Sequence, residues 1–168
     1  PRSGPPDRES TCARTTTRCF SAAVDRAIEL SARLMRFYIG KGAVPYGDHE
    51  PWIENHDDNG KCGMAAVLFT LLDEQSGAEF FSRMSIASHG PERDTGHTGN
   101  FFNMLWSLPA IAQAGPQATG AWMKEFGTWY HDLARRWDGA WLHQGPPEPG
   151  YDSYKGWDCT GAYLLGYA

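Results

Sequence analysis

The sequence predicts an all-α domain built from repeated helical hairpins, and three observations support that prediction. Every sustained apolar pattern repeats with the helical period, and no stretch alternates with the period of two that a half-buried strand shows. Segments that are apolar on all sides alternate along the chain with amphipathic segments. The 168 residues amount to one domain, at about 100–200 residues per domain. We therefore expect inner helices enclosed by protein and outer helices with one wet face.

Composition and charge exclude several classes of function. Hydrophobic residues make up 41% of the chain, charged residues 21%, and the formal net charge is −5. This is the composition of a globular domain with a core, and a net negative charge does not attract nucleic acid. The longest apolar run, Met64–Leu72, is far shorter than the roughly 20 residues that a bilayer requires. We expect no nucleic-acid partner and no membrane span.

The two ends of the chain differ from its middle. Residues 1–18 are rich in Pro, Arg, Ser and Thr and predict a disordered tail or linker, which leaves 19–168 as the helical domain. The final apolar segment, Thr160–Ala168, has no polar tail and no stop signal. We therefore expect a domain truncated at its C-terminus, whose partner is the remainder of its own longer chain. Four cysteines without a CxxC motif leave the compartment open.

The first half of the domain predicts three helices. The first, about Ser21–Ile39, is amphipathic, and the second, about Lys61–Asp73, is apolar on all sides. The third is short, and Ser76 and Glu79 have the spacing of a capping box at its start. The apolar stripe of the first helix comprises Val24, Ala27, Ile28, Ser31, Met35 and Tyr38.

The second half predicts three more helices. The fourth, about Thr98–Gln113, is mostly apolar, and we expect Pro109 to kink it or to open its later turns. The fifth has Pro116 in its first turn and reaches Trp137. The sixth follows a Gly- and Pro-rich loop and is apolar. The stripe that we expect the fifth helix to bury comprises Ala118, Trp122, Phe126, Trp129, Leu133 and Trp137.

The three apolar helices open in the same way. Each has a small or thiol-bearing residue, then a glycine, then an apolar run, and the aligned glycines are Gly63, Gly99 and Gly161. A glycine in the first turn has no side chain, so it lets crowded inner helices approach one another closely. The shared entrance therefore indicates a repeated hairpin.

The chain resembles an uncharacterised bacterial family of α/α toroids in the strings GHTGNFFNMLWSLP (Gly96–Pro109), LARRWDG (Leu133–Gly139) and WDCTGAYLLGYA (Trp157–Ala168). More distantly, it is similar to terpenoid cyclases of the squalene-cyclase type and to protein prenyltransferases. The resemblance covers about Ala22 to the end and implies a partial α/α toroid. It implies little about activity, because that superfamily includes glycan-processing enzymes, lanthionine-type cyclases and non-catalytic binders.

In such a toroid, the loops that enter the inner helices gather at one end. Here these loops carry many titratable residues, His143 among them. Several carboxylates around an aromatic-lined hollow are what acid–base catalysis requires, whereas solvated loops with Asp residues as helix caps are the alternative. The candidate catalytic residues are Asp57, Asp58, Asp94 and Asp158.

Zinc is the one cofactor to weigh. Cys62, His97 and Cys159 fall at the entrances of three inner helices, and thiolate with imidazole suits Zn²⁺. Prenyltransferases and lanthionine-type cyclases bind zinc in comparable places. The prenyltransferase Asp-x-Cys spacing is missing, because Asp158 directly precedes Cys159. We expect the cysteines to be packing residues and the domain to have no cofactor, with zinc as the alternative.

Polar residues recur on the otherwise apolar fourth helix. Asn100, Asn103 and Ser107 have the spacing i, i+3 and i+7, and polar groups enclosed by protein must be paired. Either they bond neighbouring helices or they line a wet cavity. Large aromatic residues nearby would offer stacking surfaces for a ligand, or would be ordinary core. The candidate substrate-binding residues are His97, Asn100, Asn103, Trp106, Trp157 and Tyr163.

Three functions fit these residues. The first is an enzyme that acts on a glycan-like substrate by carboxylate acid–base chemistry at the cavity mouth, with His97 as a proton shuttle or a ligand. The second is a non-catalytic binding or scaffold module of a larger bacterial protein, periplasmic or secreted, whose ligand is a small molecule or a glycan. The third is a terpenoid-cyclase-like or prenyltransferase-like enzyme.

Overall fold

The computed structural model describes residues 9–45, 50–53, 56, 60–94, 100–145 and 155–167, with side chains from residue 22 onward except those of 91 and 94. Regular structure in this part of the chain is almost entirely helical, which confirms the all-α prediction. None of the helices in these residues is long and apolar enough to cross a bilayer. The chain divides into two compact units, residues 1–34 and 35–168.

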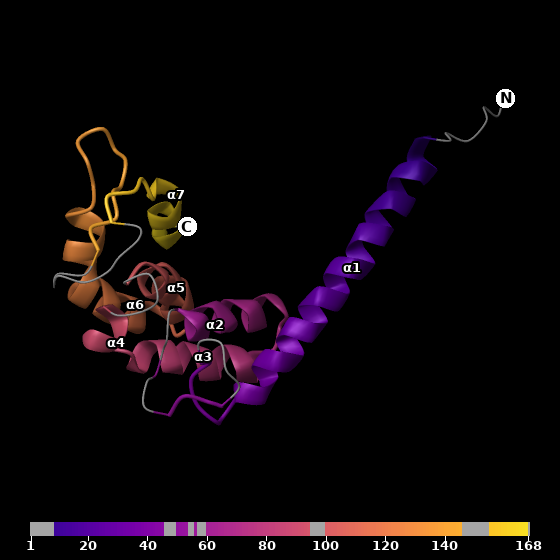
Figure 1. Cartoon of the computed structure of the whole chain (residues 1–168), viewed down its shortest axis with the longest axis horizontal. Helices are drawn as coiled ribbons and strands as arrows, with labels where there is room; N and C mark the ends of the chain where they lie inside the picture. The colour runs from indigo at the N-terminus through magenta and orange to yellow at the C-terminus, as the bar shows by residue number, and fades with distance from the viewer. Residues whose placement is uncertain are drawn as a thin grey trace. The chain divides into compact units, whose positions relative to one another are not determined.

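The first unit is formed by helix α1 (Glu9–Tyr38), whose last turn belongs to the second unit (Figure 1). The helix begins twelve residues before the predicted Ser21. Val24 and Ile28 of the predicted apolar stripe are exposed, and Arg26 forms an ion pair with Glu29 one turn later, at 3.0 Å. Local pairs of this kind support an exposed helix modestly.

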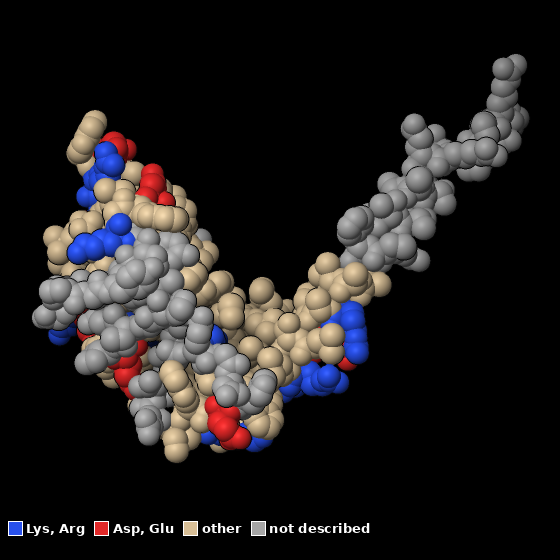
Figure 2. Space-filling view, in the orientation of Figure 1, with Lys and Arg blue, Asp and Glu red and all other residues tan. Residues whose placement is uncertain are grey.

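The second unit contains the remaining helices, a π-helix and a short 3₁₀ turn. Their bounds are α2 Lys61–Leu71, α3 Gln75–Ala87, α4 Pro91–Asp94, α5 Phe101–Ala112, α6 Pro116–Trp122, the π-helix η1 Met123–Asp132, α7 Thr160–Leu164 and the 3₁₀ turn η2 Leu165–Tyr167. Helices α2 and α3 form a hairpin, and α5 packs against both (Figure 1). Helix α6 packs on α5 and continues directly into η1. On the face of this unit drawn in Figure 2, basic and acidic side chains are interspersed.

Two hydrophobic clusters stabilise the second unit. The first lies between α2, α3 and the end of α1, and the rings of Phe69 and Phe81 stack in it 5.7 Å apart. The second lies between α5, α6, η1 and α7. Helix α5 belongs to both, since Ala110 packs in the first cluster and Met104 and Leu108 pack in the second.

Glycines at the start of α2 let it approach α5 closely. A Cβ atom on Gly63 would lie 2.7 Å from the carbonyl oxygen of Trp106, and one on Gly60 would lie 2.3 Å from that of Phe102. This is the close approach that the sequence predicts for the inner helices. A Cβ on Gly161 would meet no described atom within 4 Å, so the described residues show no close approach there, and Gly99 lies outside the described residues.

The α2–α3 turn corrects the predicted capping box. Helix α3 begins at Gln75 after Glu74, and no side-chain hydrogen bond caps it. Glu79 pairs with Arg83 instead. Asp73 (φ 58°) has the left-handed conformation in which the amide of the next residue bonds back to Phe69 at 2.9 Å, so the backbone itself closes the end of α2.

The prediction that inner helices are enclosed on all sides holds only in part. Cys62, Ala66 and Phe69 of α2 are buried, but Met64 is 41% exposed and Leu71 80% exposed. In the described residues, therefore, α2 is covered on the side that faces α3 and α5. Helix α5 is shorter than predicted and continues through Pro109.

The predicted stripe of the fifth helix holds through Trp129, which is partly buried against the second cluster, and is wrong beyond it. Leu133 is 69% exposed and Trp137 93% exposed, whereas Tyr130 and Ala134 are buried. The reason is the π-helix, whose hydrogen bonds run from i to i+5 and widen each turn. The buried positions are therefore spaced by four residues from Trp122 through Phe126 to Tyr130 and Ala134, rather than following the 3.6-residue period.

The Gly63→Ala substitution tests the close approach of α2 and α5. We expect it to lower the free energy of unfolding by about 1–3 kcal/mol, because its methyl group would displace the α5 backbone. Gly161→Ala, which also adds one methyl group in a first helical turn, is the control, and it should leave stability unchanged or raise it by up to about 1 kcal/mol. Urea denaturation measures both, and equal effects of the two changes would refute the close approach.

Candidate functional site

The second hydrophobic cluster contains a stack of three aromatic rings. The Tyr163 ring of α7 lies between the rings of Tyr130 and Trp141, at 4.5 Å and 6.4 Å, and the planes are within 18° of parallel. Burial, reinforced by the neighbouring Tyr163, raises the pKa of the Tyr130 phenol well above its usual value. The Tyr130 hydroxyl is therefore neutral at physiological pH.

Two buried histidines border this stack. His143 Nδ1 lies 3.2 Å from the hydroxyl of Tyr163, and its ring packs edge to face on Phe101 at the start of α5. His131 accepts a hydrogen bond at its backbone oxygen from the Trp141 indole, at 3.1 Å. Burial lowers the pKa of the His131 imidazole, although the nearby Asp132 carboxylate opposes that shift, so His131 is neutral at pH 7.

Asn103 bonds neighbouring segments, which decides between the two alternatives for this residue. Its side-chain oxygen accepts a hydrogen bond from the backbone of Gly60 at 2.7 Å, and its nitrogen donates to the carbonyl of Glu92 at 3.0 Å. It therefore ties the start of α2 and the short helix α4 to α5. Ser107, also buried, donates to the carbonyl of Met104 in its own helix.

Asn100 has a different environment. It is fully buried immediately before α5, and neither its side-chain oxygen nor its nitrogen has a hydrogen-bond partner among the described residues. Each buried polar atom left unpaired costs roughly 1–3 kcal/mol. An uncompensated group of this kind is the strongest indication of a ligand contact among the predicted site residues.

The structure places one of the four candidate carboxylates. Asp158 is exposed, and its Oδ1 accepts hydrogen bonds from the hydroxyl and the amide of Thr160, at 2.6 and 3.0 Å. These two bonds lower the pKa of Asp158, which is the behaviour of a residue that caps the start of α7. Asp57, Asp58 and the side chain of Asp94 lie outside the described residues.

The remaining predicted residues are spread over several elements. Trp106 is half-buried on α5, Trp157 is exposed before α7, and Tyr163 is buried in the aromatic stack. His97 lies outside the described residues. The predicted stripe leaves out His131, which a 3.6-residue period turns away from the core, and Tyr130, which lies four residues after Phe126. The four-residue spacing of Trp122, Phe126 and Tyr130 is the signal that would have found Tyr130.

The two described cysteines occupy different clusters. Cys62 is buried in the first hydrophobic cluster, where its sulfur accepts a hydrogen bond from the amide of Val44 at 3.4 Å. Cys159 is partly buried against the second cluster, and neither cysteine forms a disulfide bond in the part of the chain that the structure describes. No three His, Cys, Asp or Glu side chains in the described part of the chain are grouped so that they could hold a metal ion.

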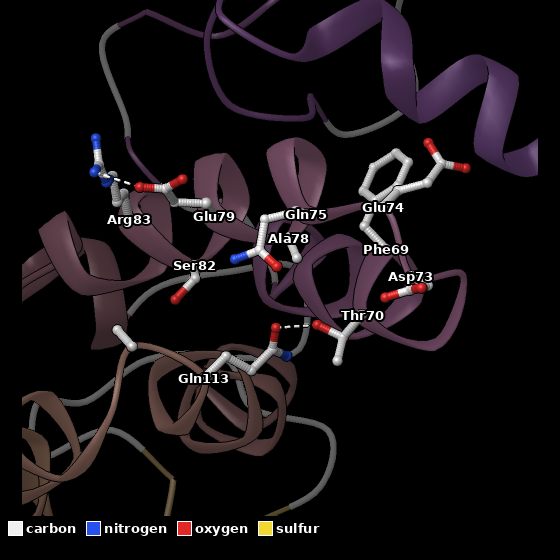
Figure 3. Close-up of a pocket in the computed structure, with 11 residues that line it drawn as sticks. Phe69, Thr70, Asp73, Glu74, Gln75, Ala78, Glu79, Ser82, Arg83 and Gln113 are labelled. Carbon is white, nitrogen blue, oxygen red and sulfur yellow. Dashed lines mark hydrogen bonds and ion pairs between the residues drawn. The ribbon is translucent and has the colours of Figure 1, made fainter.

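A surface cleft of about 580 Å³ lies between the C-terminal ends of α2 and α5 and the first half of α3 (Figure 3). Its walls include the carboxylates of Asp73, Glu74 and Glu79. Glu79 pairs with Arg83, and Glu74 accepts a hydrogen bond at 2.8 Å from Arg36, which lowers the pKa of Glu74. Of the predicted site residues whose side chains the structure describes, none lines this cleft.

A family model described as a domain of unknown function (DUF6288) matches residues 19–168. The chain belongs to the DUF6288 family. No curated protein and no solved structure matches it. The matched residues of this DUF6288 domain include those of both hydrophobic clusters, and its function has to be argued from the site itself.

Replacement of Asn103 by Ala should destabilise the DUF6288 domain by about 2–4 kcal/mol, because two buried backbone groups lose their partners. Ser107→Ala, buried on the same helix, is the matched control and should cost less than about 1 kcal/mol, since its hydrogen bond lies within α5. The free energy of unfolding in urea measures both changes. A loss at Asn103 no larger than that at Ser107 would contradict the bridging role.

The DUF6288 domain should lose stability as the pH falls through the range in which His131 titrates. The folded pKa of His131 is below 6.5, so the unfolded chain takes up the proton first, and the stabilisation is present above pH 6.5 and declines below it. His131→Phe should reduce this slope between pH 7.5 and 5 in urea denaturation. Gln117→Ala, an exposed change at a residue that does not titrate, is the control and should leave the slope unchanged, whereas an unaltered slope in His131→Phe would refute the assignment.

Proposed function

We propose that this DUF6288 domain is an enzyme that acts on a glycan-like, polyhydroxylated substrate where the loops enter α5 and α7. One observation carries the proposal: the buried Asn100 carboxamide has both of its polar atoms unpaired. A carboxamide offers an acceptor oxygen and two donor hydrogens. Sugar hydroxyls both donate and accept hydrogen bonds, so neighbouring hydroxyls of one sugar ring satisfy both ends of the amide.

The surroundings of α5 and α7 support a carbohydrate ligand. The exposed indole of Trp157 lies just before α7 and offers a flat apolar face beside polar groups, the combination that sugar rings require. The hydrogen-bonded pair of His143 and Tyr163 adds a polar contact within the aromatic cluster. His143 packs on Phe101, the residue after Asn100, so these groups belong to one region of the fold.

The proposed acid–base roles follow from the charge of each carboxylate. A general acid must hold its proton near neutral pH, and the lowered pKa of Asp158 keeps that side chain ionised. Asp158 is therefore suited to electrostatic stabilisation or to the role of base. The role of acid goes to one of Asp57, Asp58 and Asp94, with His97 as the shuttle that the sequence predicts.

A second candidate, a non-catalytic binding module, is favoured by the cleft between α2, α3 and α5. Its volume suits a small ligand, and the carboxylates of Glu74 and Glu79, each paired with an arginine, offer polar contacts. Glu74, Glu92 and Asp158, the described carboxylates with shifted pKa values, all have them lowered. Binding at the cleft without turnover would identify this function.

The α/α-toroid arrangement belongs to the same proposal. Two features support it: apolar α2 and α5 pack against each other at Gly63, and each is followed by a helix that covers it, α3 or α6. An experimental structure of the protein would test this arrangement by showing whether α2, α5 and α7 line one side of a ring.

The experiment compares wild type and Asn100→Ala on a panel of soluble oligosaccharides. Released reducing ends report turnover, and calorimetry reports binding. We expect Asn100→Ala to weaken binding at least about tenfold, the value of one well-placed hydrogen bond in a buried site. Asn100→Ala should lower the free energy of unfolding by less than Asn103→Ala does, because no hydrogen bond to a described residue is lost with the Asn100 side chain.

Gln117→Ala on the exposed face of α6 is the control and should change neither property. If Asn100→Ala kept full binding and turnover, the glycan site would be refuted. If the wild type bound an oligosaccharide without releasing product, and Gln75→Ala in the cleft abolished that binding, the domain would be a binding module instead.

A further inference from the structure

The part of α1 in the first unit has a broad apolar face. Four large apolar side chains on this face are exposed: Val24, Ile28, Leu30 and Leu34. At about 100° per residue, they lie within roughly half of the helix circumference. The charged side chains of the same turns lie on the opposite side, within an arc of about 100°: Asp25, Arg26, Glu29 and Arg33. Since α1 is the only element in the described part of this unit, no other element of the unit covers the apolar face.

The width of this face distinguishes between possible partners. A helix that pairs with one other helix needs only a narrow stripe, two positions in every seven. A helix that lies on a bilayer surface buries a wide apolar face and keeps arginines on its polar side. Arg26 and Arg33 lie one turn before and one turn after Leu30, at the edge of the apolar face. Their long aliphatic stems can lie along apolar surface while their guanidinium groups reach headgroups.

The charge of α1 favours an anionic surface. By sequence, Glu9–Tyr38 contains five arginines and three acidic residues, whereas the rest of the chain contains ten basic and 17 acidic residues. Two positively charged copies of α1 repel each other, which disfavours a second copy of this helix as the partner. Anionic phospholipid headgroups attract a basic helix. Positive charge is thus concentrated on the one helix that carries the broad apolar face.

We propose that α1 binds an anionic phospholipid surface. The helix lies along the surface, with Val24, Ile28, Leu30 and Leu34 among the acyl chains and the arginines among the headgroups. Such a helix enters one leaflet only, so the binding does not require the length and hydrophobicity of a helix that crosses a bilayer. The proposal is independent of the proposed glycan function, because none of these residues belongs to that site.

Flotation of the full chain with lipid vesicles tests the proposal. We expect the chain to bind vesicles of phosphatidylcholine mixed with phosphatidylglycerol. Binding to vesicles of phosphatidylcholine alone should be at least about fivefold weaker, because an arginine near an anionic surface contributes roughly that factor. A chain that does not bind the anionic vesicles, or that binds both kinds equally, would overturn the proposal.

A matched pair of substitutions tests the apolar face. Ile28→Gln removes one apolar side chain from it and should weaken binding to the anionic vesicles about tenfold. Ala22→Gln introduces the same side chain at an exposed position on the charged side, and it should change binding by less than about twofold. Far-ultraviolet circular dichroism verifies that both variants keep the helix. Equal effects of the two changes would show that this face is not the contact surface.

Arg33→Gln tests the charge and leaves the apolar face intact. It should weaken binding to the anionic vesicles about fivefold and leave binding to phosphatidylcholine alone unchanged. The same loss on both kinds of vesicle would contradict an electrostatic contact. Sedimentation of the chain without lipid tests the other partner, and it should not depend on protein concentration. Self-association that Ile28→Gln abolishes would assign the face to a second copy of the chain and overturn the lipid proposal.

Discussion

Helices α2 and α5 approach so closely that a side chain has no room on either glycine at the start of α2. Both the described fold and the proposed site depend on this contact. It places Asn103 within reach of Gly60, and the same amide fixes α4 through Glu92. The first turn of α2 therefore has no side-chain cap of its own, because a residue on another helix takes that role. Asn100 immediately precedes α5, the helix that this contact fixes against α2.

The second organising feature is the π-helix. By widening its turns, η1 brings Tyr130 and Ala134 to the core and leaves Leu133 and Trp137 in solvent. It also buries His131 beside Trp122.

Much of the fold could be predicted from hydrophobic period alone. The bounds of α2 and α3 follow the sequence closely, because apolar residues, a proline-free run and a turn mark them. The period could not predict the π-helix, because no residue type encodes the widened turn and a 3.6-residue pattern assumes the regular helix. The site was less predictable. The sequence selected Asn100 and Asn103 by their shared spacing, yet only tertiary contacts distinguish a bridging amide from an unpaired one. The candidate catalytic carboxylates lie in predicted loops, and the hydrophobic pattern of a sequence does not predict where loop side chains lie in the fold.

Helix α5 supplies side chains to both hydrophobic clusters, and this sharing has a thermodynamic consequence. Ala110 lies in one cluster and Leu108 in the other, only half a turn apart. Neither cluster can melt without disturbing the same short helix, so residues 35–167 should act as one cooperative foldon, with α5 amides among the slowest to exchange. A substitution that loosens the start of α2 would then also reduce the rigidity of the aromatic stack.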